Sequence, residues 1–536
     1  PVPAAARPPV REAGGSAPRP PQLVLLSADS MGLLERYAAD VLDALDALDP
    51  ADRPTVGALA HTLGGRAPLK ARLAIVATGT EEFTGRLRRA VRQLEDGARG
   101  DLGDDAFAAE APLPWARRRI ALLYPGQGSR GTGMMRELYE GYAGFRTAAD
   151  ALGAVAGPDT AALLSGTAGA GNQGLPPAAE GCRPLLGAVL QLAATRLLAD
   201  CGVTPDLTLG HGVGEFAAAA AAGALTGEDT VRLLAGRGAA LRRALESGPP
   251  GGMLAVQTDE ETCRRLVEGV DGVWPACFNE QRQIVVSGTA EGLAALRRAC
   301  AAAGVVTAVL EAAGPFHSPL LAPAEEGVRA VLAGLRVAAP VLPFVSSVDA
   351  GLCADPAALR ELWARHACAP VRFGDAVRAA YGAGARVFLQ VNGGGSLLTA
   401  VRRTLYHRDD VHLFAADDPA GSDGRGLVRT LARLAVLGAP VDPRGLVPAE
   451  DRRLVDLVGA LPCRAPAPAA PPAGLPADAD IHELLRLVHH QAALLAHLTT
   501  ALPSPAPAEA PAPRAPRPRE TADPAGGSAT AHPAAG

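Results

Sequence analysis

The segment Gly210 to Phe216, GHGVGEF, constrains the fold more than any other stretch, because it joins an apolar run to an alanine-rich helical stretch through a very short turn. Gly210 and Gly214 flank this turn, and a bulky side chain at either position would collide with the crowded backbone of a sharp strand-to-helix elbow. In a functional elbow the central residue is a Ser, Cys or Asp that stands above the sheet as a nucleophile. Here the centre is Gly212, which has no side chain. The segment predicts an α/β fold whose elbow lacks its nucleophile.

The rest of the chain agrees with an α/β fold. From the apolar run IALLYP, Ile120 to Pro125, to about residue 445, helical patterns alternate with short apolar runs, which is typical of parallel strands covered by helices. We expect this domain over residues 113–445. Within it, residues 251–311 have the order β-α-β-β-α-β, which predicts a ferredoxin-like subdomain inserted into the larger one.

A small α/β unit is expected before this domain, over residues 22–112. It begins with a strand at Leu23 to Ala28, continues with a helical pattern, and contains a second strand at Leu73 to Ala77. Residues 1–21 are rich in Pro, Ala and Arg and predict a disordered linker. The chain opens at Pro1 without a methionine, which is compatible with a piece cut from a longer polypeptide.

The C-terminal part predicts a linker over residues 446–476, a helix over 477–503 and a disordered, Pro/Ala-rich tail over 504–536. Apolar positions of the helix are spaced alternately four and three apart, which suits a docking or dimerising helix. A helix that packs back on the preceding domain is the alternative. The spaced positions are Ile481, Leu485, Val488, Ala492, Leu495 and Thr499.

Charge and cysteine content exclude several function classes. The 51 basic and 56 acidic residues give a formal charge of −5 without a basic stripe, so nucleic acid is not expected as a partner. The 8 cysteines include no CxxC pair, so we expect reduced thiols in a cytoplasmic protein, with no disulfide and no metal site. No apolar run approaches the ~18 residues of a membrane span, and no signal peptide precedes the fold, so no membrane association is expected.

Three further segments carry residue types suited to acyl chemistry. In FHSP, His317 follows a turn, where an imidazole can act as general base and then general acid, although a structural histidine is the alternative. In PGQGS, residues 125–129, a glycine-rich turn after a strand offers backbone N–H groups to an oxyanion. Arg237, in LLAGRGAAL, is either a surface arginine or, if it faces a pocket, a partner for a carboxylate.

In this order and spacing the segments resemble the acyltransferase domain of modular polyketide synthases, which is related to the malonyl-CoA:acyl carrier protein transacylases. The resemblance covers about residues 22–460 and includes the linker that precedes the acyltransferase. It implies an α/β-hydrolase-like domain with a ferredoxin-like insert and an active site in the cleft between them. It implies no cofactor and no metal.

Carried over position by position, the resemblance puts the catalytic serine of the family on Gly212 and its base on His317. The oxyanion donors become the amides of Gln127 and Val213, and the carboxylate-binding arginine becomes Arg237. Phe316 and His211 fall on further substrate-binding positions. The carbonyl that orients the catalytic histidine is expected in APVRF, near Arg372.

Two motifs depart from the family pattern. GPFH is closest to the malonyl-type signature, because Phe316 would crowd a branched extender, but Gly314 and Pro315 match neither common version. In QVNGGGSLL, Gln390 and Asn392 replace the usual residue types. We interpret this second departure as relaxed constraint near the site.

Without a nucleophile, covalent transfer would be slower by about a millionfold. We therefore expect a pseudo-acyltransferase, a structural and docking domain of a polyketide synthase that makes antibiotics, with its carrier charged by a separate acyltransferase. The expected partners are an acyl carrier protein, neighbouring synthase domains and malonyl-CoA, in a homodimeric assembly. The alternatives are a malonyl-type acyltransferase altered at this one residue, a hydrolase in which His317 activates water to cleave acyl thioesters, and an unrelated binding role.

Overall fold

The computed structural model describes residues 19–126, 135–165, 182–417 and 424–455. The chain divides into two compact units, residues 1–463 and 464–536, and all described residues belong to the first. The helix expected over residues 477–503 therefore lies outside the described residues, as do the C-terminal tail and residues 1–18.

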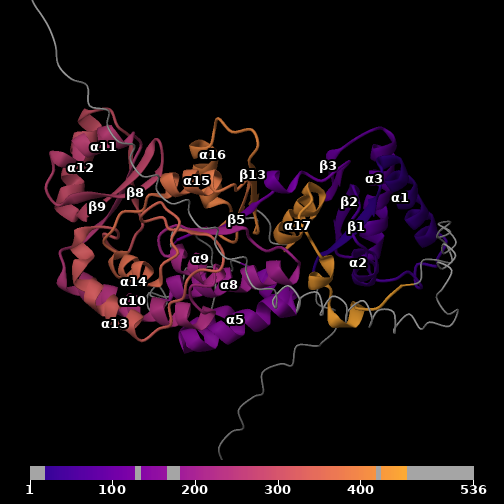
Figure 1. The fold of residues 1–536 in the computed structure, drawn as a ribbon, viewed down its shortest axis with the longest axis horizontal. Helices are drawn as coiled ribbons and strands as arrows, with labels where there is room; N and C mark the ends of the chain where they lie inside the picture. Colours follow the sequence, from indigo (N-terminus) through magenta and orange to yellow (C-terminus); the bar gives the residue numbers. More distant parts are fainter. Residues whose placement is uncertain (1–18, 127–134, 166–181, 418–423, 456–536) are drawn as a thin grey trace, which may run out of the picture. The chain divides into compact units, whose positions relative to one another are not determined.

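The N-terminal part of the described chain is a small α/β unit built on an antiparallel sheet of order β1-β2-β4-β3 (Figure 1). Alternate strand residues face opposite sides of a sheet, and Val24, Leu26 and Ile75 pack on one face against its three helices. Ser30 caps the first of these helices with its side chain. The elements are β1 (Gln22–Ala28), α1 (Met31–Asp46), α2 (Val56–Gly64), β2 (Ala71–Ala77), α3 (Thr80–Glu95), β3 (Gly100–Gly103) and β4 (Ala106–Ala109).

The large subdomain is built on a parallel sheet of order β11-β6-β5-β12-β13. Its strands are β5 (Ile120–Tyr124), β6 (Leu207–Gly210), β11 (Phe344–Val345), β12 (Val387–Gln390) and β13 (His412–Ala415). Along β5, Leu122 and Tyr124 join one hydrophobic core, whereas Ala121 and Leu123 join another. Both faces are therefore buried, which explains why the strands read as continuous apolar runs in the sequence.

Helices cover the two faces of this sheet. The first core contains residues of α5 (Ala143–Ala156), α8 (Arg183–Asp200), α9 (Gly214–Ala221), α10 (Gly227–Ser247) and α17 (Arg425–Leu437). The second contains residues of α15 (Phe373–Gly382) and α16 (Ser396–Thr404). The remaining α-helices are α4 (Arg136–Gly141), α6 (Pro158–Ser165), α13 (Glu325–Ala333) and α14 (Pro356–Arg365).

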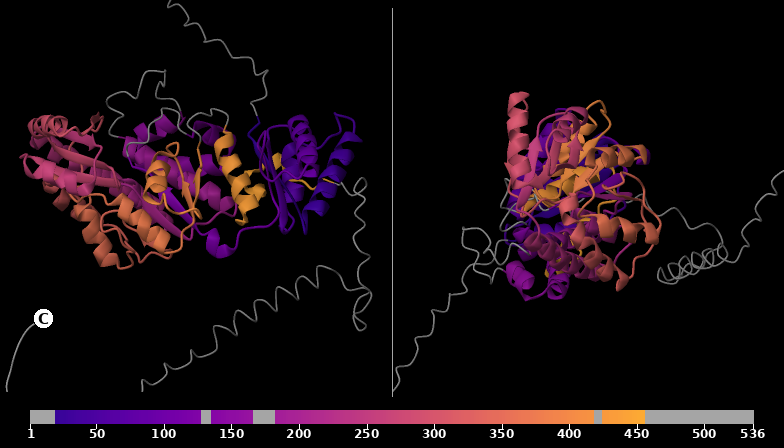
Figure 2. Two further views of the ribbon diagram at one scale, coloured as in Figure 1. Left: turned by 90° about the horizontal axis from the view of Figure 1, so that it is seen from above. Right: turned by 90° about the vertical axis from the view of Figure 1, so that its left-hand side faces the viewer.

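A smaller subdomain is inserted between α10 and α13 (Figures 1 and 2). It contains β7 (Gly251–Val256), α11 (Glu260–Glu268), β8 (Val273–Glu280), β9 (Gln283–Thr289), α12 (Ala290–Ala302) and β10 (Thr307–Leu310). The strands form an antiparallel sheet of order β10-β7-β9-β8, the ferredoxin-like arrangement. One face packs on α11 and α12, and Met253, Cys277 and Val285 on the other face join the core that α15 and α16 share.

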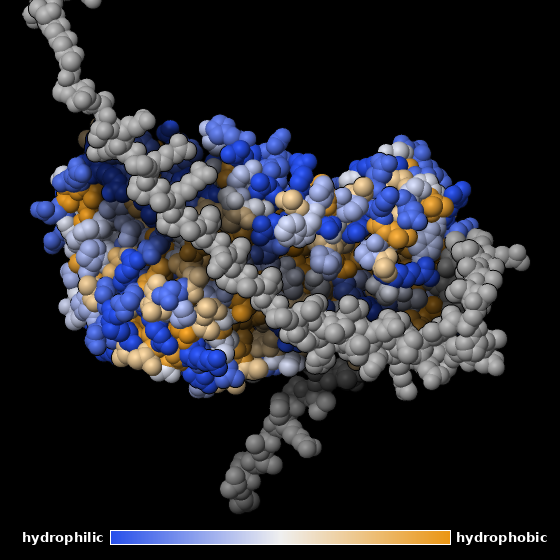
Figure 3. All heavy atoms as spheres, in the orientation of Figure 1, coloured by the Kyte–Doolittle hydropathy of each residue, from blue (hydrophilic) through white to orange (hydrophobic). Residues whose placement is uncertain are grey.

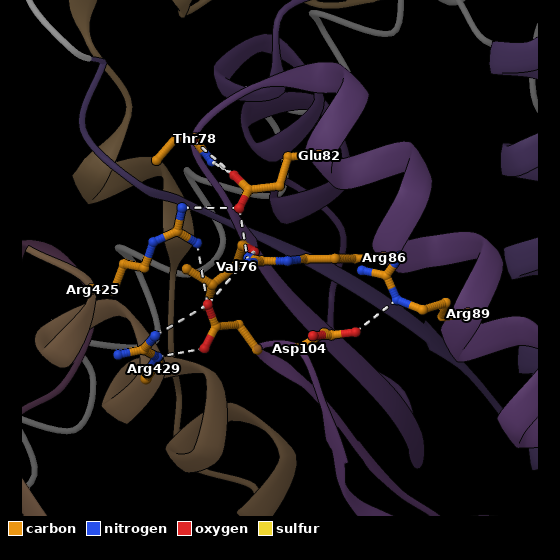
Figure 4. A network of polar contacts seen from close by, with 9 residues as sticks. Val76, Thr78, Glu82, Arg86, Arg89, Asp104, Arg425 and Arg429 are labelled. Carbon is orange, nitrogen blue, oxygen red and sulfur yellow. Dashed lines mark hydrogen bonds and ion pairs between the residues drawn. The ribbon is translucent and has the colours of Figure 1, made fainter. Parts of the chain in front are cut away.

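The N-terminal unit and the large subdomain share a hydrophobic core and an ionic network. Leu23, Val76 and Phe107 pack into the core that includes α17. Asp105, in the turn between β3 and β4, accepts from Arg86 at 3.1 Å, from Arg425 at 3.1 Å and also from Arg429. Glu82 pairs with Arg425 at 2.9 Å, and Figure 4 shows these side chains converging from α3 and α17.

After α17 the chain returns to the N-terminal unit. Thr55, the N-cap of α2, donates its hydroxyl proton to Asp451 at 2.7 Å, and the amide of Val455 donates to the hydroxyl of Thr62 at 2.9 Å. Hydrophobic and hydrophilic side chains are interspersed on the face drawn in Figure 3. Among the described helices, none is both long enough and apolar enough to span a bilayer.

Candidate functional site

Three neighbouring strands of the parallel sheet end at the same edge. β5 lies between β6 and β12, and the residues that follow these strands are Pro125, His211 and Val391. Because the strands are parallel, their carboxyl ends lie together, and the order of the sheet places this edge where the chain connections diverge to opposite sides. This edge is where open α/β sheets bind ligands, and it carries the elbow.

The elbow has the backbone that its glycines predict. A β-carbon added to Gly210 would lie 2.3 Å from the Cα atom of Glu215, and one added to Gly214 would lie 2.1 Å from the carbonyl oxygen of Tyr124. Neither position can therefore hold any other residue without moving the backbone. The amide of His211 donates to the same Tyr124 carbonyl at 2.8 Å, which ties the turn to β5.

Gly212 occupies the centre of the elbow with a φ of +51°, in the left-handed region that side-chain-bearing residues rarely adopt. An ideal β-carbon on Gly212 would lie 3.4 Å from the Nε2 atom of His317, and no other heavy atom of the described residues, apart from its chain neighbours, comes within 4 Å of it. Among the described residues there is room for a β-carbon above the elbow, and it would face the imidazole.

His317 is held by backbone groups of the segment that follows α14. Its Nδ1 atom lies 3.1 Å from the carbonyl oxygen of His366 and 3.0 Å from that of Ala369, and its amide donates to the carbonyl of Ala367 at 2.8 Å. A carbonyl only accepts hydrogen bonds, so the proton is assigned to Nδ1. The lone pair of Nε2 then faces the space above Gly212.

The environment of His317 keeps its ring neutral. Burial first, and then the nearby charge of Arg237 and the ring of His211, lower its pKa from 6.5 to about 4. The φ of His317 is +61°, an uncommon backbone conformation for a residue other than glycine. Such strain is kept at functional sites, where the surrounding structure holds it.

Arg237 projects from α10 into this cluster and is 5% exposed. It forms no ion pair with any described residue, and its Nε atom has no hydrogen-bond partner there. Burial lowers its pKa to about 10, so the guanidinium remains charged at neutral pH. A buried cation without a carboxylate partner is costly unless a ligand supplies the anion.

His366 is a site residue that the sequence reasoning missed. Its ring is fully buried, 5.4 Å from the ring of His317 and 5.0 Å from that of Phe216. Its Nδ1 atom lies 3.5 Å from Nη2 of Arg237. The only available signal was its place three residues before Ala369, at the edge of the APVRF segment.

Of the other expected site residues, His211 and Val213 lie at the elbow, and one lies outside the described residues. His211 lies beside the elbow with its Nε2 atom 2.7 Å from Oδ1 of Asn279, so it links the two subdomains, and burial lowers its pKa. Val213 precedes α9, and its amide donates no hydrogen bond within the described residues, so it is free for an oxyanion. Gln127 lies outside the described residues.

Two carbonyls contact Nδ1 of His317: that of Ala369, inside the APVRF segment where one was expected, and that of His366, three residues earlier. Arg372 itself points elsewhere and pairs with Glu260 at 3.3 Å and with Asp375. In the described part of the chain no three His, Cys, Asp or Glu side chains are grouped as metal ligands would be.

Phe316 is half-buried and contacts both the large-subdomain core and the core shared with the insert. The residues before it, which match neither common signature, have packing roles. A β-carbon on Gly314 would lie 2.5 Å from Cδ2 of Leu245, and Pro315 packs against Gly251 at the start of β7. The absence of a side chain at Gly314 therefore leaves room for the side chain of Leu245.

The QVN motif does not show relaxed constraint. Gln390 accepts from the amide of Leu397 at 2.8 Å and donates to the carbonyl of Asn392 at 2.5 Å. The side chain of Gln191 donates to Oδ1 of Asn392 at 3.2 Å and to the carbonyl of Pro125 at 2.8 Å. These fully buried amides satisfy one another and hold the turn after β5 beside the elbow.

Comparison with known proteins agrees with this geometry. The family model described as acyl transferase domain matches residues 121–419, which include the elbow, His317 and Arg237. The chain is 32% identical over 307 residues to the malonyl CoA-acyl carrier protein transacylase of Bacillus subtilis and covers 94% of that protein. The chain belongs to the acyltransferase domain family.

Relatives of this acyltransferase-family chain include very long synthases. It is 33% identical over 402 residues to the mycoketide-CoA synthase of Mycobacterium tuberculosis, a match that takes in 74% of this chain and 9% of the synthase. A solved acyltransferase domain of an iterative polyketide synthase of enediyne biosynthesis is 28% identical, with a TM-score of 0.56, and the match covers 79% of this chain and 97% of that domain. These neighbours confirm the expected fold class.

Proposed function

We propose that this chain is a pseudo-acyltransferase: a domain of a polyketide synthase that holds a malonyl-type thioester in its cleft but forms no acyl-enzyme. One observation carries the proposal. The base, the elbow and the buried arginine stand in the arrangement that acyl transfer needs, yet the position 3.4 Å from Nε2 of His317 belongs to Gly212 and carries no oxygen. Without a nucleophile, oxyanion stabilisation and binding remain, and covalent transfer does not.

The family supports the proposed partners. A malonyl-transacylase solved with its acyl-carrier protein is 25% identical to this chain, with a TM-score of 0.52. We infer that an acyl carrier protein and neighbouring synthase domains dock here, that a separate acyltransferase charges the carrier, and that malonyl-CoA is the ligand. We further propose a homodimeric, cytoplasmic assembly in antibiotic biosynthesis.

Labelling with radioactive malonyl-CoA tests the proposal. We expect no label on the denatured, unmodified chain, because no oxygen is available for acylation. Gly212→Ser should be labelled if the rest of the site is intact. Gly212→Ala is the matched control, because it adds the same β-carbon and the same backbone strain without the hydroxyl. Stable label on the unmodified chain would refute the proposal.

A hydrolase is the second candidate, and the open space above Gly212 favours it. A water molecule there would face the lone pair of Nε2 of His317, which could take its proton. Against this, a pKa of about 4 makes His317 a weak base at neutral pH, where general bases work best near the operating pH. Release of CoA from malonyl-CoA that disappears in His317→Ala would establish hydrolysis. Equal release by both proteins would dismiss it.

A further inference from the structure

Glu215 is a buried carboxyl group in the elbow segment that takes no part in the arrangement of base, oxyanion donors and arginine. It lies in the first turn of α9, three residues after Gly212, and is 0% exposed. Among the described residues it pairs with no arginine or lysine, and its partners are hydroxyl and amide groups. A buried carboxyl group costs free energy unless donors surround it, so these donors indicate what Glu215 does.

Two serines that follow β11 supply the donors. The hydroxyl of Ser346 donates to Oε1 of Glu215 at 2.8 Å, and the amide and the hydroxyl of Ser347 both donate to Oε2, at 3.0 and 2.9 Å. β11 is the parallel neighbour of β6, so the two strands end at the same edge of the sheet. The carboxyl group therefore connects the elbow, which follows β6, with the segment that follows β11.

Ser347 in turn holds the segment that supports the base. We call residues 366–372 the histidine strap, because three of its carbonyls contact His317. The carbonyl of Ser347 accepts from the amide of Arg372, the last residue of the strap, at 2.5 Å. The preceding residue, Val371, makes two backbone hydrogen bonds with β8, at 2.8 and 2.7 Å. The strap is therefore fixed to the insert through Val371 and to the large subdomain through Ser347.

These contacts form one path from the elbow to the base. The amide of Glu215 donates to the carbonyl of Gly212 at 3.0 Å, and its carboxyl group accepts from Ser347, 132 residues away in the sequence. Ser347 then accepts from the strap that supports His317. Every step of the path is a hydrogen bond between buried or partly buried groups, which are ordered more strongly than exposed ones.

We propose that Glu215 is a positioning residue: through Ser347 it fixes the histidine strap, and with it the imidazole of His317, over the centre of the elbow. Because Glu215 is fully buried, it acts through Ser347 and offers no surface to a ligand. The inference goes beyond the proposed function, since it concerns how His317 is placed and holds whether or not the cleft forms an acyl-enzyme.

This positioning depends on the shape of the side chain and not on its charge. Burial raises the pKa of Glu215 to about 7, so both charge states occur near neutral pH. Both donors of Ser347 contact Oε2, which leaves Oε1 to carry the proton and donate it to the hydroxyl of Ser346. Glutamine can make the same contacts, with its oxygen toward Ser347 and its NH₂ group toward Ser346. Glu215→Gln should therefore keep the strap in place, whereas Glu215→Leu should release it.

Hydrogen exchange measured by mass spectrometry tests the path in the unmodified chain. Residues 346–348 and the histidine strap should open as one cooperative unit, with the same protection against exchange. Glu215→Leu should speed exchange of the strap by about tenfold or more, and Glu215→Gln should leave it within about twofold. Ser346→Ala is the matched control, because it removes a hydrogen bond to the same carboxyl group but leaves Ser347 in place. Independent opening of the two segments in the unmodified chain, or equal exchange in all variants, would overturn the inference.

The rate of acylation in a Gly212→Ser background gives a second measure. At saturating malonyl-CoA, adding Glu215→Leu should slow labelling by about tenfold to a hundredfold, because a base displaced by about 1 Å loses much of its effect. The concentration for half-saturation should stay unchanged, and Glu215→Gln should keep the rate within about twofold. Equal rates with and without Glu215→Leu, or a rate in Glu215→Gln as low as in Glu215→Leu, would overturn the inference.

The outcomes for the proposed function are separate. Label on the chain that keeps Gly212 would refute the proposed function and leave the exchange results as they are. A Gly212→Ser chain that takes no label bears on the proposed function alone, and the exchange measurement then decides the role of Glu215.

Discussion

Nε2 of His317 lies 3.4 Å from the point where a β-carbon on Gly212 would stand. The imidazole therefore faces the centre of the elbow, which carries no side chain. The backbone at Gly212 has a φ of +51°, although glycine can adopt many other conformations. The surrounding contacts hold this conformation, notably the hydrogen bond from the Glu215 amide to the Gly212 carbonyl at 3.0 Å.

Restoring a side chain at the elbow should cost stability. Gly212→Ala should lower the free energy of unfolding by about 1 to 2 kcal/mol, because a left-handed backbone is unfavourable for residues with a β-carbon. Gly97→Ala is the control, since Gly97 has a φ of +82° and open space around its β-carbon position. Urea unfolding should give similar losses for both. A far larger loss at Gly212 would mean that the space above the elbow is not open.

The ionic network that connects the N-terminal unit with α17 should depend on Asp105. Asp105→Asn removes the carboxylate that three arginines share, and breaking such a partly buried network should cost about 3 to 5 kcal/mol. Asp104→Asn is the matched control, because Asp104 also has a positive φ but, among the described residues, pairs only with Arg89 and has a side chain that is 61% exposed. Asn tolerates the left-handed backbone at both positions. Equal stability of the two variants in thermal unfolding would contradict the importance of this network.

The carboxyl group of Glu215 should make stability fall as pH rises. It is fully buried and accepts hydrogen bonds from Ser346 and Ser347, and burial raises its pKa from 4.5 to about 7. The folded state therefore binds more protons than the unfolded state between pH 4.5 and 7, and this group weakens the fold progressively over that range. The total is roughly 3 kcal/mol. Urea unfolding at pH 5 and 7.5 should show this decline in the unmodified chain and a smaller one in Glu215→Gln, whereas equal declines would refute it.

The amide network behind the elbow should stabilise the turn after β5. Gln191→Leu leaves the carbonyl of Pro125 and the side chain of Asn392 without this donor, so we expect a loss of about 1 to 3 kcal/mol. Arg196→Leu, on the same helix, removes only an exposed pair with Asp200 and should cost less than about 1 kcal/mol. In a Gly212→Ser background, Gln191→Leu should also slow acylation. Unchanged stability and rate would indicate that the network is dispensable.

Local sequence patterns predicted the features that depend on nearby backbone. Gly210 and Gly214 could be placed at an elbow because the clashes that exclude other residues come from Glu215 and Tyr124, groups that any such turn brings close. The alternation of apolar runs and helical patterns predicted the parallel sheet and the β-α-β-β-α-β insert, because hydrophobic periodicity along the chain depends on the local secondary structure.

Features that depend on contacts distant in sequence could not be predicted. Gly314 is explained by Leu245, and His366 belongs to the site because α14 ends beside the loop that carries His317. The interpretation of Gln390 and Asn392 as relaxed constraint took account of residue types alone, and their partner Gln191 is 201 residues away from Asn392. No pattern within the motif could have shown that pairing.

The return of the chain to α2 has a consequence for engineering. Thr55 holds Asp451 and Thr62 holds Val455, so the residues that follow α17 are attached to the N-terminal unit, which precedes the large subdomain in the sequence. An acyltransferase body from a related synthase, exchanged for residues 113–438, would leave both of these contacts in place, because their four residues lie outside the exchanged segment. The N-terminal unit can therefore be kept when the acyltransferase domain is exchanged. The replacement domain must retain Arg425 and Arg429, because both pair with Asp105 of the N-terminal unit.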